Sequence, residues 1–203
     1  MKIKRDTLNI LAAALLLSLT ACNFGNKKSE SAQQVAGEDP VAATAEEAPV
    51  ADERGYIVKV GDPLPDFTVL YGPDKEVPVS NYKGKVIMLQ FTASWCGVCR
   101  KEMPFIESDI WQKHKDNEDF LLLGIDLKED MHTVEGFAKS IPVTYPITLD
   151  PDGERFALFC GPDAGVTRNI IVDRDGKMVM LTRLYEEEEF AQMCKLIDSL
   201  LIK

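Results

Sequence analysis

Two cysteines separated by two residues stand between an apolar run and a predicted helix. Cys96 and Cys99 flank Gly97 and Val98, and Trp95 precedes them. The free N–H groups and positive potential of a helix N-terminus stabilise a thiolate, and a lowered pKa makes a thiol a good nucleophile at neutral pH. About one helical turn separates the two thiols, which brings them close enough to form a disulfide. This segment therefore predicts redox chemistry.

Other uses of the cysteine pair fit the sequence less well. A structural zinc site needs a second ligand pair at similar spacing, but Cys160 and Cys194 are isolated. Covalent haem attachment needs a histidine directly after the second cysteine, where Arg100 stands. A purely structural disulfide gains little from closing so short a loop. We expect no metal and no cofactor. Cys160 and Cys194 are expected to be buried thiols, with a third redox thiol at Cys160 as the alternative.

The elements that must position the pair follow from apolar runs and helical periodicity. Runs at 86–91 and 120–125 predict buried strands. A helix is expected between them from Gly97 to His114, with a kink at Pro104. Shorter strands are expected at 66–70, 77–79 and 145–149, a hairpin at 170–172 and 178–181, and helices at 131–141, at 154–159 and from Glu186 onward. This order predicts an α/β sandwich with parallel and antiparallel strands.

Residues 1–21 have the layout of a secretory signal. Lys2, Lys4 and Arg5 precede an apolar stretch at 8–19 that is too short for a comfortable membrane span. Leu19-Thr20-Ala21-Cys22 resembles a bacterial lipobox, which implies cleavage before Cys22 and a diacylglyceryl group on its sulfur. The expected location is the cell envelope, with the protein lipid-anchored outside the cytoplasm. The alternative is an uncleaved anchor with an incidental cysteine.

A tether and one domain are expected after the signal. Residues 22–54 are rich in Ala, Glu, Gln, Ser and Asn, and this composition predicts an acidic disordered tether. Residues 55–203 are expected to form the domain. The 203 residues contain 23 Lys and Arg against 33 Asp and Glu, a formal net charge of −10. Because nucleic acid requires a basic footprint, we expect no nucleic-acid partner. We also expect contact with the membrane through lipid alone, and a monomeric protein.

The segment Phe91–Pro104 resembles the active-site region of TlpA/ResA-like, membrane-anchored thioredoxins. Further matches at 61–67, 82–85 and 173–176 extend the resemblance over about residues 57–202. It implies a thioredoxin-like three-layer α/β/α sandwich with a mixed parallel and antiparallel central sheet. The implied activity is thiol–disulfide exchange, which we expect to run as reduction. Cys96 would be the exposed nucleophile and Cys99 the resolving thiol. The implied partners are protein thiols and disulfides, with a membrane electron donor as one source of electrons.

Two positions depart from the family pattern. The cis-proline that thioredoxins place beside the C-x-x-C falls on Thr167, and threonine strongly disfavours a cis peptide bond. Six residues before the nucleophile, family members carry a buried Asp or Asn, but this chain has Gln90, which cannot accept a proton. Glu102 is a candidate for proton transfer, with a solvated helix residue as the alternative interpretation. Trp95 is expected to shield the disulfide, although a packing role fits too.

Two other functions stay open. Thr167 and Arg168 also resemble peroxiredoxins, in which an Arg near this strand and a Thr three residues before the Cys activate peroxide. Ala93 occupies that second position here, and Thr92 is displaced by one residue. A peroxiredoxin-like thiol peroxidase is therefore the first alternative. A non-catalytic binding lipoprotein on a thioredoxin scaffold, motivated by Thr167 and Gln90, is the second.

Overall fold

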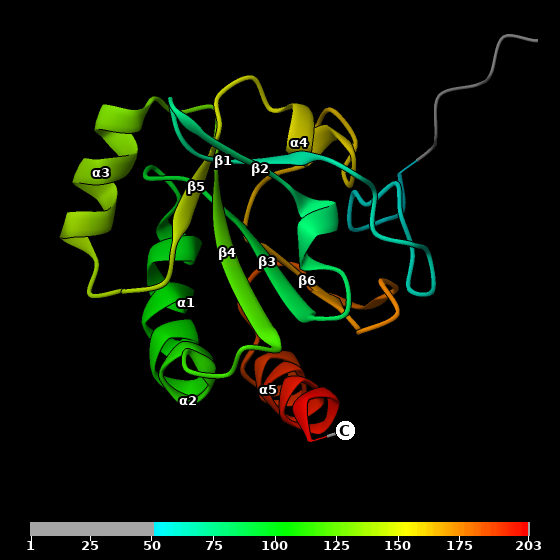
Figure 1. Ribbon diagram of the computed structural model, residues 1–203. Helices are drawn as coiled ribbons and strands as arrows, with labels where there is room; N and C mark the ends of the chain where they lie inside the picture. The colour runs from blue at the N-terminus through cyan, green and yellow to red at the C-terminus, as the bar shows by residue number, and fades with distance from the viewer. Residues whose placement is uncertain (1–50, 203) are drawn as a thin grey trace, which may run out of the picture. The chain divides into compact units, whose positions relative to one another are not determined.

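The computed structural model of the chain describes residues 51–202. The expected signal, Cys22 and the tether up to residue 50 lie outside the described residues. Within them, seven strands form one sheet in the order β2-β1-β5-β4-β3-β6-β7 (Figure 1). The strands are β1 (Thr68–Gly72), β2 (Lys75–Pro78), β3 (Val86–Thr92), β4 (Phe120–Leu127), β5 (Ile147–Asp150), β6 (Arg168–Val172) and β7 (Met178–Leu181).

Five helices, with two other helical turns, connect these strands. They are the 3₁₀ turn η1 (Val79–Tyr82), α1 (Gly97–Ile106), the π segment η2 (Glu107–Trp111), α2 (Gln112–His114), α3 (Met131–Ser140), α4 (Glu154–Ala157) and α5 (Glu187–Leu201). β3, β4 and β5 are parallel, whereas β1, β2, β6 and β7 pair antiparallel with their neighbours. The expected mixed sheet with helices is confirmed.

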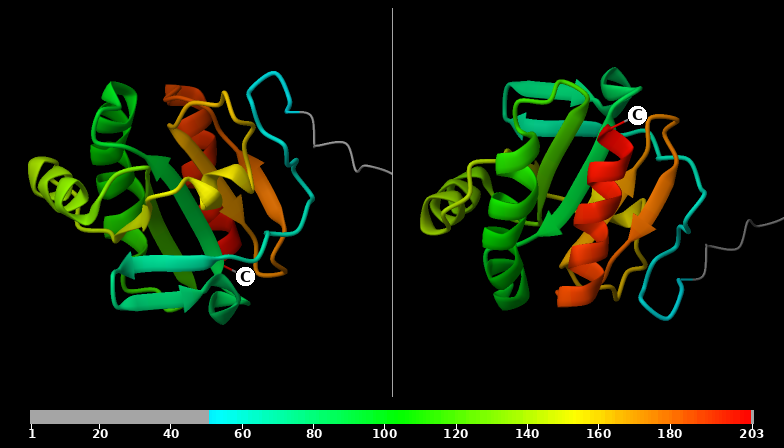
Figure 2. Two further views of the ribbon diagram at one scale, coloured as in Figure 1. Left: turned by 90° about the horizontal axis from the view of Figure 1, so that it is seen from above. Right: turned by 90° about the horizontal axis from the view of Figure 1, so that it is seen from below.

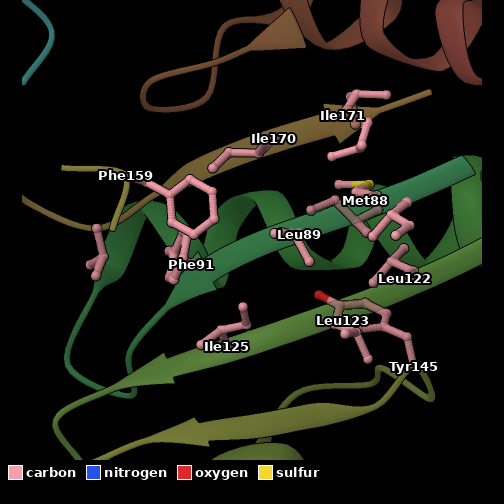
Figure 3. Close-up of a cluster of buried hydrophobic side chains, with 14 of the residues drawn as sticks. Met88, Leu89, Phe91, Leu122, Leu123, Ile125, Tyr145, Phe159, Ile170 and Ile171 are labelled. Atoms are coloured by element: carbon pink, nitrogen blue, oxygen red, sulfur yellow. The ribbon is translucent and has the colours of Figure 1, made fainter. Parts of the chain in front are cut away.

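Strand β3 lies near the centre of the sheet, and all seven of its residues are buried. Both faces of this strand are covered, which explains why its sequence is an apolar run without alternation. Its neighbours β4 and β6 supply most of the core. Figure 3 shows side chains of all three strands meeting in one cluster, together with Tyr145 and Phe159.

Helices lie on both faces of the sheet. Helices α1 and α5 lie side by side on one face (Figure 2), where the rings of Phe105 and Phe190 are 6.3 Å apart. Successive residues of β3 point to opposite faces. Thr92 accordingly hydrogen-bonds to Met103 of α1, whereas the Phe91 ring packs edge-on against Phe156 of α4 at 5.2 Å. These contacts place α4 on the face opposite α1 and give three layers.

The single helix expected at 97–114 is α1, η2 and α2 in succession. Pro104 lies inside α1 and has no N–H to continue the helical ladder. The wider π turn follows three residues later, which is one way in which a helix absorbs such an interruption. Trp111 is partly buried, and its indole nitrogen donates to Thr144 Oγ1 at 2.9 Å.

The domain begins earlier than the composition suggested. Asp52 Oδ1 accepts the N–H of Tyr56 at 2.8 Å, and Arg54 donates to the carbonyl of Leu181 at 2.8 Å. Arg168 also donates to the carbonyl of Arg54 at 2.6 Å. The assignment of residues 52–54 to the disordered tether was therefore wrong, because polar side chains tie this stretch to β6 and β7.

The two edges of the sheet differ. Strand β2 forms one edge, and three of its four residues, Lys75, Glu76 and Pro78, are exposed. Along the other edge, the N–H of Gly61 donates to the carbonyl of Met178 in β7, and Met178 donates back to Asp62, at 2.8 and 2.9 Å. In the part of the chain that the structure describes, no helix is long and apolar enough to cross a membrane.

Candidate active site

Cys96 and Cys99 form a disulfide at the N-terminus of α1, with Cα atoms 5.3 Å apart. Cys96 is the N-cap residue, and its sulfur accepts the N–H of Cys99 at 3.2 Å. Cys96 keeps 8% of its surface exposed and Cys99 none. Cys96 is thus the more accessible thiol, although it is less open than the sequence suggested. Gly97 and Val98 between them are exposed.

Trp95, the residue before Cys96, is not packed into the core. Its side chain is 66% exposed. This exposure disfavours the alternative of a packing role for Trp95, and its shielding of the disulfide stays a prediction. The remaining surface of Cys96 therefore opens beside a large exposed indole.

Thr167 lies against the disulfide from the start of β6. Its Oγ1 is 3.1 Å from the sulfur of Cys96 and 3.1 Å from that of Cys99. The residue is 1% exposed and has a φ of 66°, in the left-handed region. Its backbone is held at both ends, since its N–H donates to Phe91 and its carbonyl accepts from Leu184. The position counted from the sequence is therefore beside the C-x-x-C, with a hydroxyl in place of a proline ring.

Glu102 lies three residues after Cys99 on α1 and is only 1% exposed, so its interpretation as a solvated residue was wrong. Asn169 donates to its Oε1 at 2.7 Å, while Oε2 has no hydrogen-bond partner among the described residues. Burial raises the pKa of Glu102 to about 7, and the Asn169 amide only partly offsets this rise. A carboxyl group with such a pKa can hold or release a proton near neutral pH.

Gln90 belongs to the same buried polar cluster. It lies opposite Asn169 in the pairing of β3 with β6, and its Oε1 accepts the hydroxyl of Tyr145 at 2.8 Å. Its Nε2 has no partner within hydrogen-bond distance in the region described. Asn169 lies on β6 two residues after Thr167, and its side chain meets Glu102 of α1. Sequence reasoning missed Asn169 and Tyr145, although that spacing was readable.

A second acidic cluster holds the loop before Cys96. Glu129 accepts both the N–H and the hydroxyl of Ser94, at 2.6 and 2.5 Å, and Arg100 donates to the Ser94 carbonyl at 2.8 Å. Asp126 is fully buried at the end of β4. Burial, with Glu129 nearby, raises the pKa of Asp126 to about 8. The sequence contained a signal for this cluster, since Asp126 and Glu129 follow the apolar run at 120–125. The end of that strand lies at the same end of the sheet as the cysteine loop.

Arg168 is fully buried but its contacts lead away from the sulfurs. It donates to the carbonyls of Gly165 and Arg54, and its guanidinium lies 4.5 Å from the centre of the Tyr56 ring. The hydroxyl of Thr92 donates to the sulfur of Met103 at 3.6 Å. These contacts give no support to the peroxidase alternative, which needs both groups beside the reacting thiol.

The two remaining cysteines of the domain are not part of this site. Cys160 is buried as expected, whereas Cys194 of α5 is only partly buried, packed at the margin of the core. Burial raises the pKa of Cys160 to about 12 and that of Cys194 to about 11. Thiols of this kind are poor nucleophiles at neutral pH. Within residues 51–202, no cluster of three His, Cys, Asp or Glu side chains is arranged to hold a metal ion.

Known proteins resemble this chain in sequence and in fold. The model of the Redoxin family matches residues 59–197. The thiol-disulfide oxidoreductase ResA of Bacillus thuringiensis is 28% identical over 134 residues, covering 62% of this chain and 73% of its own. ResA of Bacillus subtilis is 27% identical over 122 residues, covering 60% and 66%.

Two solved structures extend the comparison. The solution structure of a putative protein disulfide isomerase from Bacteroides thetaiotaomicron is 58% identical, with a TM-score of 0.70, and the match covers 73% of this chain and 94% of that one. The crystal structure of a putative thiol:disulfide interchange protein DsbE from Chlorobium tepidum is 26% identical, with a TM-score of 0.62 and coverage of 71% and 99%.

Proposed function

Because the chain belongs to the Redoxin family and is a TlpA/ResA-like thiol–disulfide oxidoreductase, we propose that it reduces protein disulfides outside the cytoplasm while anchored to a membrane by lipid. The observation that carries this proposal is the Cys96–Cys99 disulfide at the start of α1, with residual exposure on Cys96 alone. A pair of this kind can accept or donate two electrons by exchange with a second disulfide.

In the proposed reaction, the Cys96 thiolate attacks one sulfur of a partner disulfide. A bond forms between Cys96 Sγ and that sulfur, and the other partner sulfur leaves as a thiolate that takes up a proton. Cys99 then attacks Cys96 Sγ, which restores the Cys96–Cys99 disulfide and releases the second partner thiol. Two electrons pass from the protein to the partner. The full burial of Cys99 supports its role as the resolving thiol.

Glu102 is proposed to take the proton from Cys99 before the resolving step. Residues three apart on a helix are neighbours, and Glu102 shares the buried face of α1 with Cys99. Its pKa of about 7 means that the carboxyl group is partly ionised at neutral pH. The free Oε2 leaves one oxygen available for the proton.

Membrane attachment is proposed on the sequence of residues 1–22, which includes the lipobox-like Leu19-Thr20-Ala21-Cys22. Two acyl chains anchor a protein far more firmly than one. Full-length protein expressed in a bacterium should partition into the detergent phase and carry a diacylglyceryl group on Cys22 by mass spectrometry, and the Cys22→Ser variant should lack that group and keep residues 1–21. Aqueous partitioning of the unaltered chain would reject the anchor and leave the thiol chemistry untouched.

The function is tested by trapping. Cys99→Ser leaves the nucleophile without its resolving partner, so it should accumulate mixed disulfides with client proteins, and Cys96→Ser should lose both trapping and disulfide reduction. Cys194→Ser removes a thiol outside the site and serves as the matched control, expected to keep full activity. Undiminished reduction by Cys96→Ser would refute the assignment. Rapid, Cys96-dependent consumption of hydrogen peroxide without trapped clients would favour the peroxidase alternative.

A further inference from the structure

One hydroxyl group lies beside the active-site disulfide, within reach of both sulfurs. Thr167 Oγ1 is equally distant, at 3.1 Å, from Cys96 Sγ and Cys99 Sγ. A threonine hydroxyl can donate one hydrogen bond and accept two. It can therefore serve both sulfurs at once when one carries a proton and the other does not.

The backbone of Thr167 is held in a conformation that costs energy. A β-branched residue at a φ of 66° is a clear outlier, and such a conformation persists only where the surrounding structure holds it. Hydrogen bonds from Leu184 and to Phe91 fix the residue there. Glycine would adopt this backbone without strain, so backbone geometry does not account for threonine. A valine would fill the same volume, and only the hydroxyl separates the two.

We propose that Thr167 is a catalytic residue whose hydroxyl, in the reduced protein, donates to the Cys96 thiolate and accepts the S–H of Cys99. This inference rests on the proposed function of the same site. The Cys96 sulfur then has two donors, Thr167 and the N–H of Cys99, at the positive end of α1. The Cys99 sulfur keeps its proton until the resolving step.

The Thr167 hydroxyl acts on the pKa values of the two thiols in opposite directions. A hydrogen bond to a charged group favours ionisation, and a hydrogen bond made by a neutral group opposes it. Thr167 therefore lowers the pKa of the attacking thiol and raises that of the resolving thiol. It also stabilises the reduced form over the disulfide, because a thiolate is a much stronger acceptor than a disulfide sulfur. Electrons leave the dithiol less readily as a result, and the reduction potential rises.

The test compares Thr167→Val, which removes the hydroxyl and keeps the shape, with Thr167→Ser, which keeps the hydroxyl. Alkylation of the reduced protein is followed against pH, with mass spectrometry to separate Cys96 from the other thiols. Because a hydrogen bond to the charged thiolate favours its ionisation, the Cys96 pKa should rise by about one unit or more in Thr167→Val. In Thr167→Ser it should stay close to the unaltered value. The equilibrium constant with glutathione should shift about tenfold in the valine variant, equivalent to about 30 mV.

Thr148→Val is the matched control. Thr148 is also buried and its hydroxyl donates to the Gly124 carbonyl at 2.8 Å, but it lies on β5, away from the sulfurs. Its loss should lower stability and leave the Cys96 pKa unchanged. If Thr167→Val does not fold, Thr167→Gly removes the hydroxyl together with the strain and should show the same rise. An unchanged Cys96 pKa in the folded variant would overturn the inference. A shifted pKa in a protein that reduces no protein disulfide would instead reject the proposed function and leave the thiolate contact established.

Discussion

Replacement of Glu102 by glutamine keeps the shape of the side chain and removes its titration. Burial raises the pKa of this carboxyl group from its ordinary 4.5 to about 7 in the folded protein. Between these pH values the folded state holds a proton that the unfolded chain has lost. The stability contributed by neutral Glu102 is therefore fully present below about pH 4.5 and is lost as the pH rises through about 7.

The magnitude follows from the two pKa values. Their difference corresponds to about 3 kcal/mol of unfolding free energy. Because Glu102 is only 1% exposed, solvent screening should reduce this figure little. The oxidised protein and Glu102→Gln are unfolded in urea across a series from about pH 4 to pH 9. Relative to the variant, the unaltered protein should lose about 3 kcal/mol over that series.

Taking the difference between the two proteins removes the contribution of other titrating groups, including Asp126. Glu188→Gln makes the same exchange on the exposed face of α5 and is the control, expected to change stability by less than about 0.5 kcal/mol. A constant difference for Glu102→Gln would refute the reasoning, because it would mean that the pKa of Glu102 is the same in the folded and the unfolded protein.

Three further changes test the elements around the site. Asp126→Asn should gain stability relative to the unaltered protein as the pH rises toward about 8, because the raised pKa of Asp126 makes its ionisation unfavourable in the fold; urea unfolding at several pH values checks this, and parallel curves would contradict it. Glu129→Ala removes two hydrogen bonds from Ser94 and should lower the free energy of unfolding by about 1–3 kcal/mol. Hydrogen exchange at the Ser94 amide should become faster, and unchanged exchange would show that Glu129 does not hold the loop before Cys96. Phe91→Ala should cost about 3–5 kcal/mol in urea unfolding because the ring is fully buried between Phe156 and Phe159, whereas exposed Val60→Ala should change stability by less than about 0.5 kcal/mol.

The chemistry of the site and its main supports were predictable from the sequence. The apolar runs before Cys96 and at 120–125 are β3 and β4 because both strands are buried on two faces. Helical spacing likewise accounts for the burial of Met103 and Ile106 on α1 and of Ile110 on η2. Local periodicity sufficed wherever burial was continuous.

The electrostatic surroundings of the cysteines were not predictable in the same way. Glu102 carries a charge type that usually faces solvent, and only the meeting of α1 with Asn169 of β6 makes its burial tolerable. Glu129 is 35 residues from Ser94 along the chain, so their contact depends on the sheet register. The left-handed backbone of Thr167 depends on hydrogen bonds to Phe91 and Leu184. Tertiary pairing decides each of these features.

The two edges of the sheet bear on how the molecule resists self-association. An unpaired edge strand is a template for another chain, and charged residues, proline or a covering segment block it. Lys75, Glu76 and Pro78 do so along β2, and the stretch from Gly61 to Leu64 covers the end of β7. In the described domain, strand addition at either edge would have to bury charge or displace this stretch. Under the proposed function, in which the cysteine loop meets protein disulfides, blocked edges would keep the sheet from pairing with a client chain.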